Sequence, residues 1–223
     1  GLLVQKNGGV GISHPLLREL VEQSAPAECR RELHDAAGQH ALDALLPLEV
    51  RANHAMRAYW GDEAMVLQER VGALCMARGD VDGAVSAFRR GLEYARREIS
   101  RGLMEDPMLA VVSFSCKLAE SLLDAGDLVG ADGTVREALA SASPIGVQRA
   151  KALAVLARLS SMRGCYEDAV AYLREASHHA LTAGDMDLVS SLRVSEQKMR
   201  QSIVPSVQNH DPVVFDLAKK AEA

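Results

Sequence analysis

The sequence predicts an all-α protein made of stacked helical hairpins and preceded by one short β-hairpin. The first observation is a glycine-centred phrase that recurs at residues 76–88, 123–135 and 161–173. The second is composition: aromatic residues make up 4% of the 223 residues while Ala, Leu and Val are abundant, which favours close helix packing. The third is a turn at residues 7–9, Asn-Gly-Gly, between two short apolar runs, which is typical of a β-hairpin.

Proline residues divide the segment after this hairpin into helices. We expect His14 to fix the junction between hairpin and first helix by hydrogen bonding, and Pro15 suits the first turn of that helix. Pro26 and Pro47 punctuate the sequence in the same way. The helices predicted here are 15–24, 27–46 and 48–60.

The recurring phrase predicts the turn of a helical hairpin. Its glycines are Gly79, Gly126 and Gly164, at intervals of 47 and 38 residues. Glycine supplies the left-handed conformation that ends a helix, and the Asp that follows in the first two copies can cap the next helix. An alanine five residues after each glycine lets two helices approach closely, and a larger apolar residue follows one helical turn later. These positions are Ala84 and Phe88, Ala131 and Val135, and Ala169 and Leu173.

A last, degenerate unit is expected to turn at Gly184-Asp185, before a helix that begins at Met186. Pro205 to Pro212 is then expected to form a linker to a short tail helix.

The repeat resembles tetratricopeptide repeats, which have a period of ~34 residues. The matching residues are Gly72, Gly79, Ala84 and Phe88 in the first copy, Leu118, Ala119, Gly126 and Ala131 in the second, and Leu156, Ala157, Gly164, Tyr166 and Ala169 in the third. The resemblance implies a right-handed superhelix, an α-solenoid. Because the intervals exceed the standard period, we expect longer helices or irregular loops.

Residues 1–40 carry a second resemblance, to the end of the winged-helix segment of bacterial STAND-class signalling ATPases. The matching residues are His14, Pro15, Leu16, Leu17, Arg18, Arg30, Arg31, Leu33 and His34, with Ile12 where the family has an aromatic residue. The resemblance implies a winged-helix remnant at 1–46, repeats at 47–203, and a linker with tail helix at 204–223. It also implies an ATPase or kinase domain upstream in the same polypeptide, and a start at Gly1 fits a piece of a longer protein.

Composition argues against several classes of function. A formal net charge of −5 argues against nucleic acid as a partner. The four cysteines form no CxxC pair, which is typical of thiols in a reducing compartment. Since no apolar run is long enough to span a bilayer and the first residues lack the basic-then-apolar layout of a signal peptide, we expect a cytoplasmic protein without membrane contact.

The sequence offers no constellation for catalysis. The phosphate-binding pattern GxxxxGK[ST] is missing, and no HExxH or Cys/His ligand set occurs. His34 and His40 are six residues apart, which places them on different sides of a helix, and His178 and His179 diverge because they are adjacent. We therefore expect no enzyme activity, no metal and no cofactor.

Two surfaces are candidates for binding a protein. The tetratricopeptide register assigns the concave groove to Glu69, Ala73, Met76, Cys116, Glu120, Leu123, Lys151, Ala154 and Arg158. A basic stripe is formed by Arg89, Arg90, Arg96, Arg97 and Arg101. This stripe is either a solvated face, interleaved with glutamates, or a site for an acidic or phosphorylated partner.

Together these observations predict a non-enzymatic interaction and regulatory module of a bacterial signal-transduction protein. It would bind a protein partner, or its own switch domain, through the solenoid surface. The alternative is a domain that senses a small-molecule inducer, which an enclosed pocket with a few convergent polar groups would favour.

Overall fold

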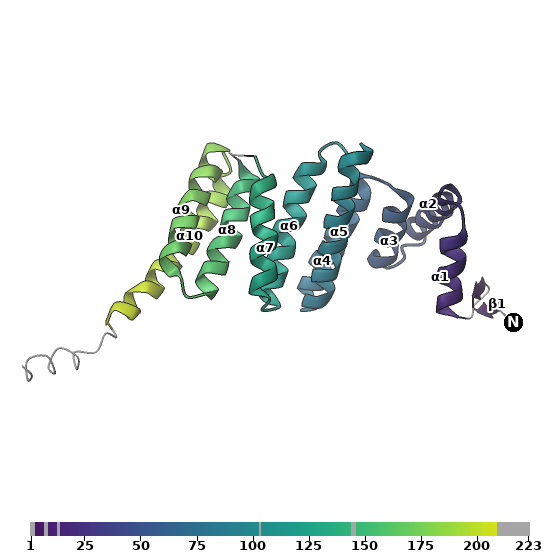
Figure 1. The fold of residues 1–223 in the computed structure, drawn as a ribbon, viewed down its shortest axis with the longest axis horizontal. Helices are drawn as coiled ribbons and strands as arrows, with labels where there is room; N and C mark the ends of the chain where they lie inside the picture. The colour runs from purple at the N-terminus through teal and green to yellow at the C-terminus, as the bar shows by residue number, and fades with distance from the viewer. Residues whose placement is uncertain (1–2, 7–8, 13, 103, 144–145, 209–223) are drawn as a thin grey trace, which may run out of the picture.

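The computed structural model describes residues 3–6, 9–12, 14–102, 104–143 and 146–208. Helices follow one another along an extended stack (Figure 1). The helices are α1 (Pro15–Ser24), α2 (Ala27–Asp43), α3 (Leu48–Ala58), α4 (Asp62–Ala77), α5 (Val81–Arg101), α6 (Pro107–Asp124), α7 (Leu128–Ser141), α8 (Val147–Met162), α9 (Tyr166–Thr182) and α10 (Met186–Gln208).

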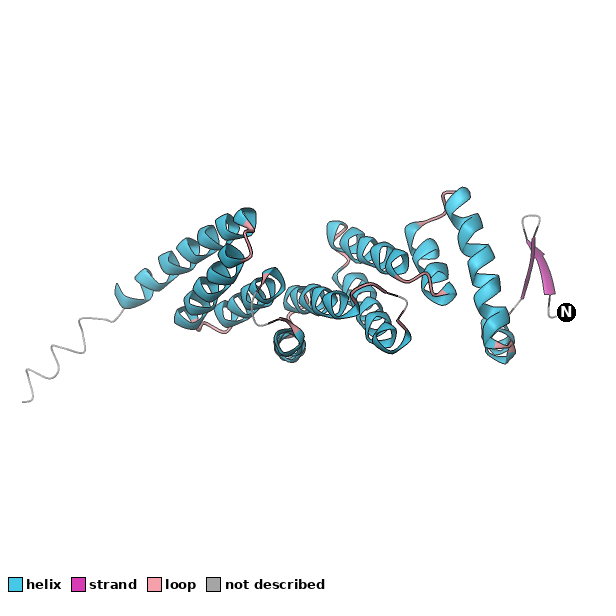
Figure 2. Ribbon diagram, turned by 90° about the horizontal axis from the view of Figure 1, so that it is seen from above, coloured by secondary structure: helices cyan, strands magenta, loops and turns pink. Residues whose placement is uncertain are grey.

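From α2 onward, each helix packs against the next one in the chain (Figures 1 and 2). Helix α6 also contacts both α4 and α8 directly. These three helices therefore form one layer of the stack, which we call the inner layer, and α5, α7 and α9 lie in the other. The arrangement agrees with the predicted all-α stack of helical hairpins.

The repeated glycines have the conformation that the sequence predicts. Gly79, Gly126 and Gly164 have φ of 75°, 81° and 79°. At the first turn, the amide of Asp80 reaches back over the glycine and donates to the Cys75 carbonyl at 2.9 Å. The Cys75 carbonyl, which also accepts from the Arg78 amide at 3.1 Å, is one of the carbonyls that the end of a helix leaves without a partner in the regular pattern.

The side chain of Asp80 then accepts from the Gly83 amide at 2.9 Å, and Asp127 accepts from Gly130 at 2.8 Å. Asp185 makes the same cap with Leu188 at 3.0 Å, after Gly184 with φ of 79°. The first two bonds confirm the capping predicted for Asp80 and Asp127, and the structure adds the same cap at Asp185.

The core lies between the two layers. Ala84, Ala131 and Ala169 are each 0% exposed, which confirms that they sit where helices approach closely. Between α4 and α5 the approach is closer still, because a Cβ added to Gly72 would lie 2.3 Å from the ring of Phe88. Glycine is therefore required there for the aromatic ring to pack onto the neighbouring helix.

Longer helices account for the longer first interval. Helix α5 has 21 residues against 14 in α7, and α6 has 18 against 16 in α8. The additional seven residues of α5 amount to about two helical turns, or ~10 Å. They extend α5 alongside the N-terminal helices.

At the N-terminus, strands β1 (Leu3–Lys6) and β2 (Gly9–Ile12) pair antiparallel. The predicted turn residues 7 and 8 lie outside the described part. The Nδ1 atom of His14 accepts from the amide of Leu16 at 3.2 Å and caps α1, as expected of a residue at this junction. Helix α2 ends at Asp43, three residues before the predicted end, because Leu45 takes a left-handed conformation with φ of 50°.

At the other end, α10 continues through Pro205 to Gln208, so the helix does not stop at the predicted boundary of 203. Proline lacks an amide hydrogen and removes one helical hydrogen bond, but the chain here stays helical past it. The predicted tail helix at 213–223 lies outside the described residues. Within the described part of the chain, no helix combines the length and the apolar character needed to cross a membrane.

Candidate functional site

The inner layer presents residues of α4, α6 and α8 on one surface, which we call the inner face. Glu69 on α4 forms an ion pair with Lys117 on α6. Farther along the same two helices, the hydroxyl of Ser121 donates to the sulfur of Met76 at 3.7 Å. The register derived from the turn glycines therefore places Glu69 and Met76 correctly against α6.

The same surface continues from α6 to α8. Asp124 on α6 forms an ion pair with Arg158 on α8. Lys117 and Asp124 were missed by the sequence analysis, although they lie three residues before and four residues after Glu120 on the same helix and so share its side.

Seven of the nine predicted groove residues are accessible to solvent. Glu69, Ala73, Met76, Glu120, Lys151, Ala154 and Arg158 are exposed or half-buried. The other two, Cys116 and Leu123, are 5% and 1% exposed and belong to the core, so their assignment to the groove is wrong. The reason is that α6 has neighbours in both layers, and more of its circumference is buried than the register alone indicates.

The electrostatic centre of the inner face is Glu120. Desolvation of its carboxyl group raises its pKa, and Asp124 raises it further. Arg158, Lys117 and Lys151 act in the opposite direction. Below it, burial raises the pKa of the Cys116 thiol to about 12, so this cysteine stays protonated.

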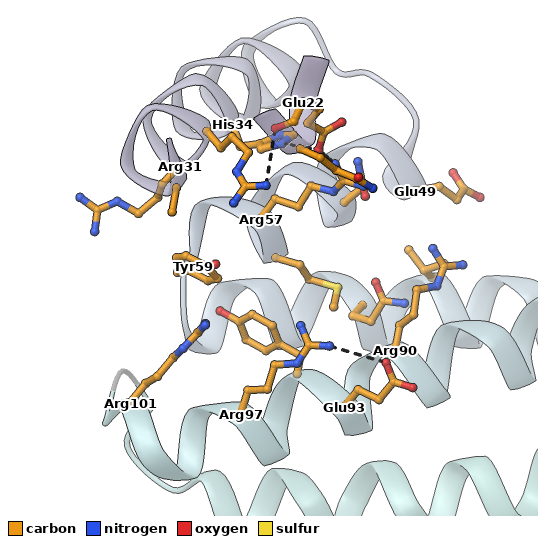
Figure 3. Close-up of a pocket in the computed structure, with 18 of the residues that line it drawn as sticks. Glu22, Arg31, His34, Glu49, Arg57, Tyr59, Arg90, Glu93, Arg97 and Arg101 are labelled. Carbon is orange, nitrogen blue, oxygen red and sulfur yellow. Dashed lines mark hydrogen bonds and ion pairs between the residues drawn. The ribbon is translucent and has the colours of Figure 1, made fainter. Parts of the chain in front are cut away.

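A second feature is a cleft of about 550 Å³ where the N-terminal helices meet α4 and α5 (Figure 3). Its lining comes from α1, α2 and α3 on one side, with Tyr59 at the edge, and from α4 and α5 on the other. Six arginines line it: Arg30, Arg31, Arg57, Arg90, Arg97 and Arg101. Four glutamates do so as well: Glu19, Glu22, Glu49 and Glu93.

Pairing inside the cleft is incomplete. Arg57 forms an ion pair with Glu22, which also accepts from His34 at 3.3 Å, and Arg97 lies 4.0 Å from Glu93 (Figure 3). Three other arginines have no carboxylate partner within 4 Å among the described residues; they are Arg30, Arg31 and Arg90. Arg30 donates to the Glu22 carbonyl at 3.5 Å and Arg90 to Ser86, so on both sides of the cleft the guanidinium groups are only partly engaged.

Side-chain contacts order one edge of the cleft. The guanidinium of Arg101 lies over the ring of Tyr59 and also donates to Glu98 at 3.3 Å. Glu98 is 0% exposed, and its Oε2 atom has no hydrogen-bond partner among the described residues. Next to it, burial raises the pKa of Tyr94 to about 12, and its hydroxyl accepts from the Gly61 amide at 3.2 Å.

The predicted basic stripe is divided between two surfaces. Arg90, Arg97 and Arg101 line the cleft, whereas Arg96 forms an ion pair with Glu137 on α7 at 2.5 Å. The side chains of neighbouring helix positions point about 100° apart around the helix axis. Arg89 and Arg96 therefore lie on one side of α5, and Arg90 and Arg97 lie on another. The prediction of a single stripe is therefore wrong.

The cleft is not predictable from the sequence, because its lining spans residues 19 to 101 and only the folded chain brings them together. The longer first repeat interval was the available signal, since the additional turns of α5 carry Arg97 and Arg101. In the described part of the chain, no three His, Cys, Asp or Glu side chains gather so that they could hold a metal ion.

No protein-family model matches this sequence, and no curated protein does. Among solved structures, the chain is similar to BtubC (BKLC) from P. vanneervenii, with 14% sequence identity and a TM-score of 0.41. The similarity covers 85% of this chain and 95% of that one.

Proposed function

We propose that this chain is a non-enzymatic interaction and regulatory module, built as a right-handed tetratricopeptide-like superhelix that belongs to a STAND-class signalling protein. The repeated glycine turns and the close approach at Ala84, Ala131 and Ala169 support the tetratricopeptide-like part. The resemblance of residues 1–40 to the winged-helix segment of those ATPases supports the second part.

The inner face is the surface that binds a protein partner, or the switch domain of the same polypeptide. The observation that carries this proposal is the charged arrangement around Glu120. Its carboxylate is exposed, and cationic side chains of α6 and α8 lie close enough to interact with it. Exposed charges contribute little to stability, so charges gathered on this surface are better suited to recognition.

Binding acts by shifting a population between docked states of the module. A partner that contacts the inner face in one state only stabilises that state by its differential affinity. No chemical step is required of the residues of the inner face.

Site-specific photo-crosslinking in cells of the natural host tests the proposal. A photoreactive residue replaces Lys151 on the inner face of the full-length protein, or Val129 on α7, which is 81% exposed, as the control. We expect one discrete adduct from position 151 that disappears with Glu120→Lys. Adducts from position 129 alone, or an adduct at 151 that survives Glu120→Lys, would contradict the inner-face proposal.

The arginine-lined cleft favours a second candidate function, sensing of a small molecule. Its volume lies in the range of small-molecule sites, and its polar groups converge from two sides. The position of the cleft between the N-terminal helices and the repeats would let a ligand bias how these two parts pack.

A further inference from the structure

We propose that the arginine-lined cleft binds a small organic phosphate that carries more than one phosphoryl group. This inference rests on the second candidate function and names its ligand class. It does not depend on the inner face, which lies on other residues of the stack.

The charge of the cleft lining favours an anionic ligand. The chain has a net charge of −5, yet six arginines and four glutamates line the cleft. Every permanent cation among these lining residues is an arginine and none is a lysine. The planar guanidinium donates in pairs to phosphate oxygens, and it is the side chain best suited to planar recognition of phosphate.

Arginines on both sides of the cleft lack a close carboxylate partner. Arg31 on α2 and Arg90 on α5 have no carboxylate partner among the described residues, and Arg97 has only a 4.0 Å contact. Figure 3 shows Arg90 and Arg97 on α5 and Arg31 on the opposite side, at the rim of the cleft with its guanidinium directed outward. A ligand that reaches both sides needs negative charge at two separated places, which a single phosphate ion does not supply.

A group with two negative charges suits this lining better than a group with one. The four glutamates offset part of the arginine charge, so a ligand with one negative charge gains little. A phosphoryl group carries up to two negative charges and three acceptor oxygens, and several guanidinium groups can donate to it at once. A carboxylate, in contrast, accepts one bidentate pair.

One cationic donor of the cleft is already held in place in the structure without a ligand. Tyr59 and Glu98 hold Arg101 from two sides before any ligand arrives. Tyr59 itself has φ of 61°, an uncommon conformation for a large side chain that places its ring at the edge of the cleft. Strained residues cluster at binding sites, and a donor that is already ordered loses less entropy on binding.

Calorimetric titration of the full chain with pyrophosphate at ~0.15 M salt tests the proposal. Separate titrations with inorganic phosphate and with citrate provide the comparison. We expect one pyrophosphate per chain, bound at least about tenfold more tightly than either of the other anions. The double variant Arg90→Gln/Arg97→Gln should weaken pyrophosphate binding about tenfold or more.

The matched control is Arg89→Gln/Arg96→Gln. It removes the same two charges from the same helix, one position earlier in each case, outside the cleft lining. We expect this control to bind pyrophosphate within about twofold of the parent. Circular dichroism establishes that both variants are folded, and Arg31→Gln on the opposite side replaces the first variant if that one unfolds.

Three results would overturn the proposal. These are no pyrophosphate binding at ~1 mM, equal losses in the two double variants, and citrate binding as tight as that of pyrophosphate. Binding of a phosphorylated peptide without binding of pyrophosphate would also overturn it. Because the photo-crosslink from position 151 does not involve the cleft, its presence or absence separates a failure here from a failure of the inner-face proposal.

Discussion

The guanidinium of Arg101 lies 4.3 Å from the ring centroid of Tyr59. This contact joins the end of α5 to the residue that ends α3, so it connects the first long repeat to the N-terminal helices. It exists because α5 is about two turns longer than α7, and because Tyr59 adopts a left-handed conformation. One helix length and one backbone angle together shape the edge of the cleft.

The backbone at Tyr59 yields the first prediction. At φ of 61°, a residue with a Cβ is strained by about 1 kcal/mol relative to glycine. Since both variants lose the ring contact with Arg101, we expect Tyr59→Gly to be more stable than Tyr59→Ala by that amount. Urea denaturation measures the difference, and equal midpoints would show that the left-handed conformation is relaxed in the variants.

The second prediction compares two glycines of the second repeat. Gly126 has φ of 81°, and an added Cβ there would meet nothing within 4 Å. Gly133, within α7, is equally open. We expect Gly126→Ala to destabilise the fold by about 1 kcal/mol, because only the backbone is strained, and Gly133→Ala to stabilise it by up to ~1 kcal/mol. Thermal melts of the pair give the test, and changes of the same sign would reject the turn assignment.

The third prediction concerns the close approach of α4 and α5. Gly72→Ala places a Cβ 2.3 Å from the ring of Phe88, and we expect a loss of about 1–3 kcal/mol from overpacking. Combining it with Phe88→Leu should recover part of that loss, because the smaller side chain makes room. A double-mutant cycle by urea denaturation measures the coupling, and strictly additive effects would contradict the contact.

The sequence predicts the repeat turns well because their signals are local. Gly126 and Asp127 fix the end of one helix and the start of the next through bonds that span only a few residues. Whether a helix position is buried depends on helices that are distant in the sequence. Leu123 illustrates this, since α6 has neighbours in both layers. The cleft was not predictable from periodicity, because Arg31 and Arg97 line the same cleft only through the packing of several helices.

The fourth prediction is a pH dependence that arises at His34. Burial, and then the charge of Arg30, lower the pKa of His34 below 6.5 in the folded chain. Below about pH 6.5 the unfolded chain therefore binds more protons, and the free energy of unfolding decreases as the pH falls. We expect His34→Gln to show a smaller loss of stability than the parent between about pH 7.5 and pH 5.5.

The control for this titration is His40→Gln, an exposed position on the same helix. Denaturation curves of the three proteins at both pH values provide the comparison. If the parent and His34→Gln lose stability equally, His34 is not the group responsible.

The last prediction separates recognition from stability at the inner face. Desolvation raises the pKa of Glu120, which means that the folded chain disfavours the charged carboxylate at neutral pH. Glu120→Gln keeps the shape without the charge, so we expect it to raise the thermal midpoint at pH 7. That gain should shrink as the pH falls toward the ordinary pKa of a glutamate, because the native carboxyl group then becomes neutral too.

In the same variant the photo-crosslink from position 151 should weaken, since the charge that recognises the partner is gone. A residue that costs stability but is needed for binding is the expected signature of a functional surface. A variant that is less stable at pH 7 and still crosslinks fully would instead identify Glu120 as a structural residue of the stack.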